Sequence, residues 1–123
     1  MISHITTPQR VPVPGGKIID EYVGRASSGD ENVSVARMSA PPGWDEPAQT
    51  PRFDEVTLVI SGSLMVEHDG GSTEIAAGEA VRTPAGERVR YVAGERGAEY
   101  VSVCVPAFEI GLAGREDGPG PAA

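Results

Sequence analysis

The stretch GWDEPAQTPRFDE, residues 43–55, runs directly into the apolar segment VTLVISG at residues 56–62. Its first part holds a glycine and two prolines, which favour a loop, whereas the following segment is rich in β-branched residues, which favour a strand. A second stretch, GEAVRTPAGERVRYVA at residues 78–93, contains a Pro-x-Gly turn between two short apolar runs. Both stretches therefore predict strands connected by loops that contain glycine and proline.

The rest of the chain follows the same pattern. Sixteen glycines and eleven prolines divide it into short apolar runs, and no apolar period of 3.6 residues persists over several turns. We predict strands at residues 17–22, 32–39, 53–67, 72–75, 80–83, 88–92 and 99–105. The longest must bend at Ser61–Ser63, where a glycine permits a bulge, and His68–Gly71 is expected to form a tight hairpin. Short, regularly spaced strands predict an all-β fold, a closed or double-sheet barrel.

The two stretches resemble the two sequence motifs of the cupins. The first cupin motif runs from a glycine through two closely spaced histidines to a glutamate and a second glycine, and the second contains a glycine, Pro-x-Gly, a histidine and an asparagine. The matching residues are Gly43, Glu55 and Gly62 in the first stretch and Gly78, Pro84 and Gly86 in the second. The resemblance covers Val33–Phe108 and implies the cupin-type double-stranded β-helix, a jelly-roll barrel.

The chain departs from the cupin pattern at the metal ligands. In the cupins, the histidines and the glutamate bind a divalent metal ion at the barrel centre. By spacing, the three histidine positions fall on Gln49, Pro51 and Val89, and the chain's two histidines, His4 and His68, lie elsewhere. The resemblance in fold therefore does not carry over the usual metal chemistry.

Consequently, no cofactor is predicted. One alternative keeps a divalent metal ion, with Glu46, Gln49 and Glu55 as an oxygen-rich ligand set, aided by Tyr91. Such ligands would suit magnesium or manganese better than softer ions.

Strand alternation predicts which side chains share the interior with Glu55. If this residue points into the barrel as its cupin counterpart does, the same face carries Gln49, Pro51, Phe53, Thr57 and Val59, and the opposite wall carries Val89, Tyr91 and Ala93. Asp54 is expected to face outward, and Arg88 and Arg90 to lie outside or at the mouth. The result is a mostly apolar pocket with a few polar groups, which is typical of a small-molecule site.

Glu55 and Tyr91 are the predicted catalytic residues. A carboxylate in an apolar barrel is costly to ionise, so we expect a raised pKa, which suits a general acid or base near neutrality. Tyr91 would donate a hydrogen bond to a substrate carbonyl or enolate. The structural alternatives are a Glu55 that is simply paired with Gln49, Tyr91 or the backbone, and a buried Tyr91 with a backbone partner.

Further ligand-binding candidates surround these two residues: Trp44, Glu46, Gln49, Phe53, Thr57, Val89 and Cys104. Trp44 would stack on a ligand, although an apolar plug or a dimer contact is the favoured interpretation. Glu46 is interpreted as a solvated loop charge. Cys104 has no neighbouring cation in the sequence, and it is interpreted as a small buried apolar residue rather than a nucleophile.

Charge and length limit the partners and the architecture. A formal charge of −8 has the wrong sign for nucleic acid or anionic membrane surfaces, and no stretch is apolar enough to span a bilayer. The lone cysteine cannot form an internal disulfide, and no secretory signal is evident, so a cytoplasmic location is expected. We divide the chain into an N-terminal arm or edge strand at 1–30, a barrel at 31–110 and a tail expected to be disordered at 111–123.

Three functions remain open at this level. The first is a metal-independent isomerase, cyclase or lyase in which Glu55 moves a proton on a small molecule. The second is a non-catalytic metabolite-binding or structural module, and the third is an atypical metal-dependent cupin with Glu and Gln ligands. By resemblance to small cupins, a homodimer is expected, with Lys17–Tyr22 as an exchanged or packed edge strand.

Overall fold

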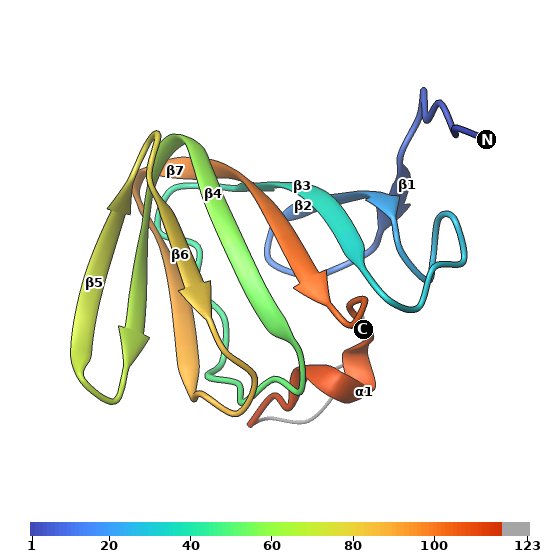
Figure 1. Cartoon of the computed structure of the whole chain (residues 1–123). Coiled ribbons are helices and arrows are strands. Elements are labelled where there is room, and N and C mark those ends of the chain that lie inside the picture. Colours follow the sequence, from blue (N-terminus) through green and yellow to red (C-terminus); the bar gives the residue numbers. More distant parts are fainter. Residues whose placement is uncertain (117–123) are drawn as a thin grey trace.

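The computed structural model describes residues 1–116. In this part of the chain seven strands and one short helix follow one another: β1 (Gln9–Val11), β2 (Ile18–Val23), β3 (Ser34–Ala40), β4 (Asp54–His68), β5 (Gly71–Ala76), β6 (Ala80–Thr83), β7 (Val89–Val105) and α1 (Ile110–Ala113) (Figure 1). Neighbouring strands pair antiparallel throughout. The all-β prediction is therefore confirmed.

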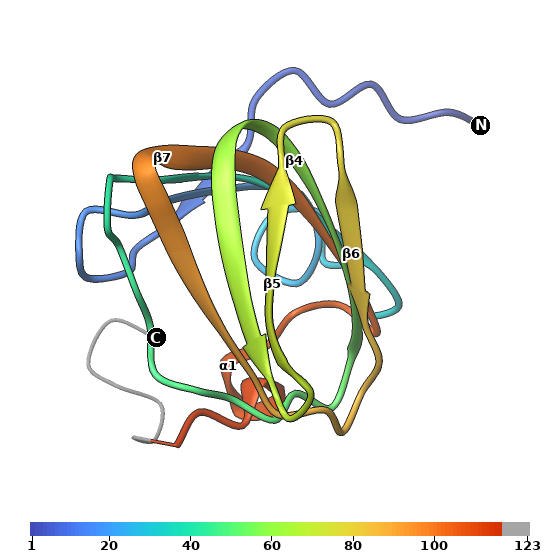
Figure 2. The same cartoon turned by 90° about the vertical axis from the view of Figure 1, so that its left-hand side faces the viewer.

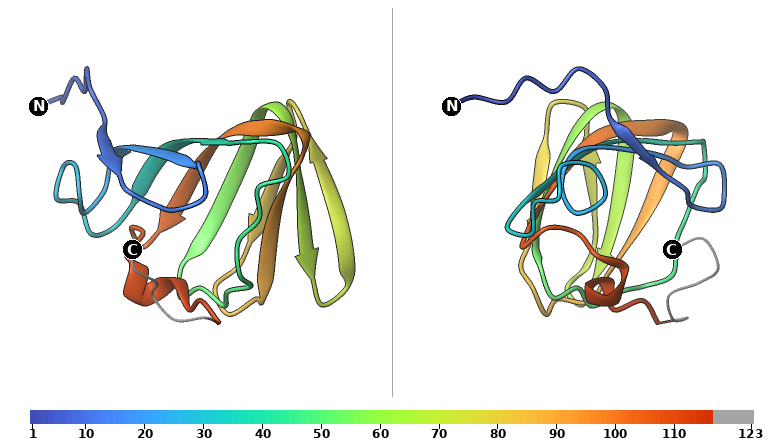
Figure 3. Two further views of the ribbon diagram at one scale, coloured as in Figure 1. Left: turned by 180° about the vertical axis from the view of Figure 1, so that it is seen from behind. Right: turned by 90° about the vertical axis from the view of Figure 1, so that its right-hand side faces the viewer.

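The two longest strands organise the barrel. The sheet runs in the order β1-β2-β3-β7-β4-β5, and β6 pairs with the first half of β4, while β5 pairs with its second half. Strand β7 pairs with β4 along both halves. Figure 2 shows β4 and β7 curving over at one end, so that each contributes to two walls of the barrel, and Figure 3 shows the same curvature from behind.

Gly62 is the residue that allows β4 to curve. The register between β4 and β7 shifts on both sides of it, between Val59 and Ser61 and between Gly62 and Leu64. Gly62 has a φ of 71°, and a Cβ atom there would lie 2.0 Å from the carbonyl oxygen of Gly97. Any larger residue would therefore clash with the neighbouring strand, and the bend predicted at this position is confirmed.

Other elements differ from the expected ones. The predicted strands at 88–92 and 99–105 are one strand, β7, whose pairing with β4 stops after Ala93 and resumes at Ala98 on the other side of the bend. Strand β1, with three residues, and α1, with four, were not predicted, since elements this short leave no periodic signal. The predicted hairpin is confirmed, with His68 paired to Gly71.

Part of the predicted disordered tail packs against the barrel. Ala113 is fully buried, and the carbonyl oxygen of Gly114 accepts a hydrogen bond from the backbone N–H of Thr50 at 3.0 Å. The backbone N–H of Glu116 donates to the carbonyl oxygen of Ala48. Residues 111–116 are therefore part of the fold, because their backbone groups pair with the loop before β4; residues 117–123 of the predicted tail lie outside the described residues.

The apolar core has two parts. The larger fills the end of the barrel where β4, β5 and β7 meet, around Val59, Leu64 and Val66. The smaller lies under α1, where Phe53 packs edge-to-face on Phe108 with 5.8 Å between ring centroids. Phe108, Ile110 and Leu112 pack against this smaller part, so α1 and the segment before it cover this end of the barrel.

Candidate functional site

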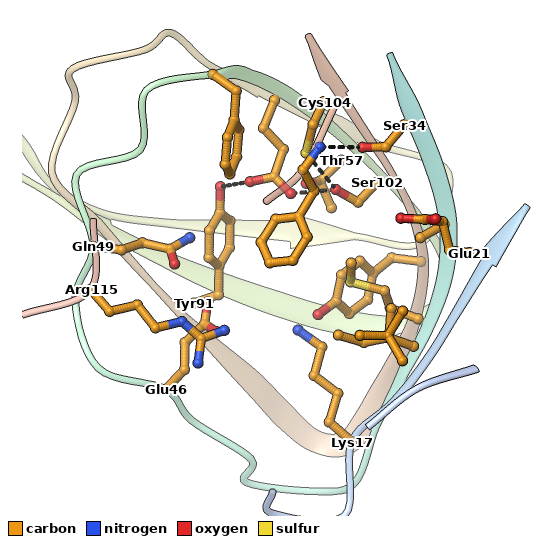
Figure 4. Close-up of a pocket in the computed structure, with 18 residues that line it drawn as sticks. Lys17, Glu21, Ser34, Glu46, Gln49, Thr57, Tyr91, Ser102, Cys104 and Arg115 are labelled. Carbon is orange, nitrogen blue, oxygen red and sulfur yellow. Dashed lines mark hydrogen bonds and ion pairs between the residues drawn. The ribbon is translucent and has the colours of Figure 1, made fainter. Parts of the chain in front are cut away.

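A pocket opens inside the barrel between the two parts of the core (Figure 4). Strands β2, β3, β4 and β7 line it together with the loop before β4 and the segment after α1. Its charged residues are Lys17, Glu21, Glu46, Glu55 and Arg115, its other polar residues are Ser34, Gln49, Thr57, Tyr91, Tyr100, Ser102 and Cys104, and its apolar wall includes Ile19, Ala36, Met38, Phe53 and Phe108. The pocket is therefore richer in charge than the sequence predicted.

The inner end of the pocket is a hydrogen-bonded group around Glu55. Ser102 Oγ donates a hydrogen bond to Glu55 Oε2, and the Tyr91 hydroxyl donates to Oε1 at 3.3 Å. The hydroxyl groups of Thr83 and Tyr91 lie 3.2 Å apart. Glu55 is only 9% exposed, so its carboxylate depends on these donors rather than on water.

Sheet register explains this arrangement. Glu55 pairs with Cys104 across β4 and β7, and Thr57 pairs with Ser102, so these four residues share the inner face of neighbouring strands. Each of them is at most 9% exposed. The alternation of side chains along two paired strands is therefore sufficient to bring the Ser102 hydroxyl to the Glu55 carboxylate.

Burial fixes the protonation state of two neighbours of Glu55. It raises the pKa of Tyr91 above the usual range for a phenol, and the adjacent Glu55 charge acts in the same direction. Burial also raises the pKa of Cys104 to about 12, again with a contribution from Glu55. Tyr91 therefore keeps its proton as a hydrogen-bond donor, and Cys104 is a neutral thiol rather than an activated nucleophile.

The mouth of the pocket is formed by Lys17, Glu46 and Arg115, which also line an adjoining hollow. The Lys17 ammonium lies 4.3 Å from the centroid of the Trp44 ring and 5.6 Å from that of Tyr100. Arg115 Nη2 lies 3.8 Å from Glu46 Oε2, and the two side chains are 16% and 9% exposed. Three charged groups from distant parts of the sequence therefore meet in a nearly dry environment.

Glu46 was interpreted as a solvated loop charge, and this is wrong. The loop carries its side chain inward, because Arg90 Nε holds the carbonyl oxygen of Glu46 at 3.1 Å. Burial raises the pKa of the Glu46 carboxyl, although Lys17 and Arg115 oppose that change. Burial alone would lower the pKa of Lys17, but Tyr100 and Glu46 outweigh it and hold that pKa above its usual value.

The pocket brings together most of the predicted site residues. Glu55, Tyr91, Glu46, Gln49, Phe53, Thr57 and Cys104 all line it. Trp44 does not: it lies in the adjoining hollow, where its ring faces Lys17. Val89 is also outside, because its side chain is 2% exposed within the larger core and its backbone pairs with that of Gln49.

Sequence reasoning missed Lys17, Glu21, Ser34, Tyr100, Ser102 and Arg115. Ser102 could have been found, because it alternates with Cys104 on a strand predicted to enter the barrel. Lys17 and Arg115 left no such signal, since they precede β2 and follow α1. Glu21 has a structural role: its Oε2 accepts hydrogen bonds from the backbone N–H groups of Ala26 and Ser27 and from the Ser27 hydroxyl.

The residues at the cupin ligand positions do not fit a metal ion. Gln49 is the only one of the three with a donor side chain, and among residues 1–116 no group of three or more His, Cys, Asp and Glu side chains is placed to hold a metal. Glu55 already accepts hydrogen bonds from Ser102 and Tyr91.

Comparison with known proteins gives the class of fold. No protein-family model matches the chain. A variant of the oxalate decarboxylase of Bacillus subtilis superposes with a TM-score of 0.78 and 20% identity, covering 94% of this chain and 33% of that one. An RmlC-like cupin of Shewanella frigidimarina NCIMB 400 superposes with a TM-score of 0.74 and 17% identity, covering 88% and 95%. This chain therefore has the cupin fold.

A curated relative is closer in sequence. The endoribonuclease YbeY of Myxococcus xanthus strain DK1622 is 49% identical over 107 residues, which is 86% of this chain and 36% of that protein. The chain thus spans about a third of the relative's length. In the described part of this chain, no helix is long and apolar enough to cross a membrane.

Proposed function

We propose that the barrel binds a small organic molecule in its pocket and that Glu55 transfers a proton on it, as in isomerase, cyclase or lyase chemistry. The observation that supports this most directly is the position of Glu55, a buried carboxylate that lines the pocket beside the Tyr91 hydroxyl. A general base must lie within hydrogen-bond reach of the proton it removes. Glu55 meets this condition for a ligand that fills the inner end of the pocket.

The residues around Glu55 have complementary parts in such a step. Glu55 takes a proton from a carbon next to a carbonyl group, and the electron pair of the broken C–H bond moves onto the carbonyl oxygen. Tyr91 keeps its proton, and its single O–H can turn from Glu55 Oε1 to donate a hydrogen bond to that oxygen. Glu55 then returns the proton to another carbon in an isomerisation, or to the leaving group in an elimination.

The test is proton exchange in heavy water. A panel of small carbonyl compounds is incubated with the protein, and loss of the C–H signal next to the carbonyl is followed by proton NMR. Glu55→Gln should slow exchange by about 100-fold or more, the range expected for loss of a general base. Glu87→Gln, at an exposed position, is the matched control. Exchange at the wild-type rate in Glu55→Gln would contradict the proposal.

A non-catalytic binding module is the second candidate. The full pairing of Glu55 with Ser102 and Tyr91 favours it, because a carboxylate with two donors is also a stable structural group. In that case a bound ligand is recovered unchanged after long incubation. Turnover of the ligand would eliminate this candidate.

Ribonuclease activity is not proposed for this chain. The relative named for that activity is about three times longer than the matched segment, and a formal charge of −8 opposes binding to a phosphate backbone. We propose that RNA cleavage in that relative depends on residues outside the matched segment. Cleavage of RNA by this chain alone would contradict this.

We also propose a homodimer. The outer face of β4 exposes three apolar side chains in alternation, Val56, Leu58 and Ile60, which are 40%, 41% and 50% exposed. The predicted edge strand 17–22 corresponds to β2, which pairs with β1 on one side and with β3 on the other, so it has no free edge for a partner subunit. We therefore place the dimer interface on the outer face of β4. Light scattering that reports a 12.8 kDa particle at micromolar concentration would contradict a dimer.

A further inference from the structure

The charged groups of the pocket differ in whether they have hydrogen-bond partners within the protein. Among its carboxylates, Glu21 accepts hydrogen bonds from Ala26 and Ser27, and Glu55 accepts them from Ser102 and Tyr91. Both acids therefore have partners inside the protein. Of the two cations of the pocket, Lys17 has the Tyr100 hydroxyl as a partner, and Arg115 has a buried Nε atom without any partner among residues 1–116.

Arg115 shows this most clearly. Its side chain is 16% exposed, and its Nε atom is buried without a hydrogen-bond partner within residues 1–116. The contact of its Nη2 with Glu46 is 3.8 Å, too long for a hydrogen bond. A guanidinium group is costly to bury without acceptors, and in the described part of the chain the Nε–H of Arg115 lacks one.

Lys17 lines the same pocket and the same adjoining hollow as Arg115. Its ammonium group is positioned over the rings of Trp44 and Tyr100 rather than against a carboxylate. Figure 4 shows the ends of the Lys17 and Arg115 side chains pointing into the pocket from different walls. Glu46 is the carboxylate that acts on both of them, since its charge and those of Lys17 and Arg115 influence one another, and Glu55 acts on Lys17 as well.

We infer that the natural ligand carries a carboxylate group, which Lys17 and Arg115 bind at the mouth of the pocket while the rest of the molecule extends along the apolar wall toward Glu55. This inference rests on the proposed function and names the class of ligand. A carboxylate matches the fork of a guanidinium group with two parallel hydrogen bonds. A doubly charged phosphate fits less well, because Glu21, Glu46 and Glu55 line the same pocket.

Trp44 makes this inference testable. It is the only tryptophan of the chain, and the Lys17 ammonium lies 4.3 Å from its ring. An anion that draws Lys17 away from the ring should therefore change the intrinsic fluorescence. The probes are acetate, butanoate, hexanoate and benzoate, each beside its uncharged primary amide, which has nearly the same shape.

At least one carboxylate should bind with a Kd tenfold or more below that of its amide. Lys17→Met and Arg115→Gln should each raise that Kd about tenfold, as followed by amide shifts in proton–nitrogen NMR spectra, which do not depend on Trp44. Arg10→Gln, which removes an exposed cation paired with Asp20, is the matched control and should leave the Kd unchanged. Folding of each variant is checked by circular dichroism.

The inference would be overturned if no carboxylate of the panel bound more tightly than its amide. It would also be overturned if Lys17→Met and Arg115→Gln bound the carboxylate with the wild-type Kd. An equal loss in Arg10→Gln would show a non-specific charge effect and would also overturn it. Glu55→Gln separates the two proposals, since it should abolish proton exchange but keep the preference for the carboxylate. A preference without any exchange in the wild type would refute the catalytic proposal alone.

Discussion

The inner end and the mouth of the pocket are built in different ways. At the inner end, Glu55 and Ser102 come from neighbouring strands, and hydrogen bonds within the protein satisfy the buried charge. At the mouth, Lys17, Glu46 and Arg115 come from three distant segments, and their charges are close together without hydrogen bonds between them. The inner end therefore pairs its carboxylate within the protein, whereas the mouth holds Arg115 Nε, a buried donor without a partner among residues 1–116.

The largest expected effect is a difference in stability between a variant of the inner end and a variant of the mouth. Ser102→Ala should lower the free energy of unfolding by about 1–3 kcal/mol, because Glu55 Oε2 loses its donor in a buried site. Arg115→Met keeps the apolar stem and removes an unsatisfied charge, so its cost should be under about 1 kcal/mol, or it should stabilise the protein. Urea unfolding measures both, with Ser39→Ala, at an exposed position on β3, as the control.

The opposite order of the two stability losses would contradict the comparison between the inner end and the mouth. If Arg115→Met were more costly than Ser102→Ala, the Arg115 charge would already be satisfied in the free protein. The mouth would then be a structural ion pair with Glu46.

A smaller effect is expected for Glu46, whose contribution to the stability of the protein should depend on pH. Burial raises its pKa, so the carboxyl holds its proton to a higher pH in the folded state than in the unfolded chain, although Lys17 and Arg115 oppose that change. The contribution of Glu46 to stability is full below its unfolded pKa, near 4.5, and is lost as the pH rises through the folded value. Relative to the wild type, Glu46→Gln should therefore gain on the order of 1 kcal/mol or less as the pH rises from about 4 toward neutrality.

Thermal unfolding at several pH values measures this difference. Glu87→Gln, at an exposed position, should show none of it. A stability difference between wild type and Glu46→Gln that stays constant with pH would mean that Glu46 is solvated in solution.

The smallest effect is expected from metal ions. Manganese or magnesium ions, or their removal by a chelator, should change the Tm by less than about 1 °C, because Glu55 is paired with Ser102 and Tyr91 and residues 1–116 hold no group of three metal-ligating side chains. Elemental analysis of the purified protein beside Glu55→Ala completes the test. A stoichiometric metal that disappears in Glu55→Ala would favour the alternative ligand set of Glu46, Gln49 and Glu55.

Much of the inner end could be predicted from the sequence. The alternation from Gln49 to Val59 gave the correct inward face, and all of Gln49, Phe53, Glu55, Thr57 and Val59 are buried. A period of two residues is a local property of an extended strand, and the sequence displays it directly. The bend at Gly62 was also readable, because only glycine accepts that backbone conformation so close to a neighbouring strand.

The mouth could not be predicted in the same way. Glu46 sits in a loop that turns inward, and nothing in its immediate sequence distinguishes it from a solvated charge. Arg115 lies in a segment whose glycine, proline and charged residues are typical of a disordered tail, yet backbone pairing with the loop before β4 holds that segment in place. Both errors have one cause, since loop positions depend on long-range contacts that leave no periodic pattern.

The sequence by itself determined the all-β barrel and the strand that carries Glu55, and it shows no histidine at the positions that the cupin resemblance assigns to the metal ligands. These follow from strand periodicity, from glycine geometry and from the residue types at fixed spacings. Only the tertiary structure decided that Ser102 and Tyr91 satisfy Glu55 and that Lys17 and Arg115 meet beside Glu46. The physical reason is that pairing across the barrel joins residues many positions apart, and their contacts exist only once the chain has closed on itself.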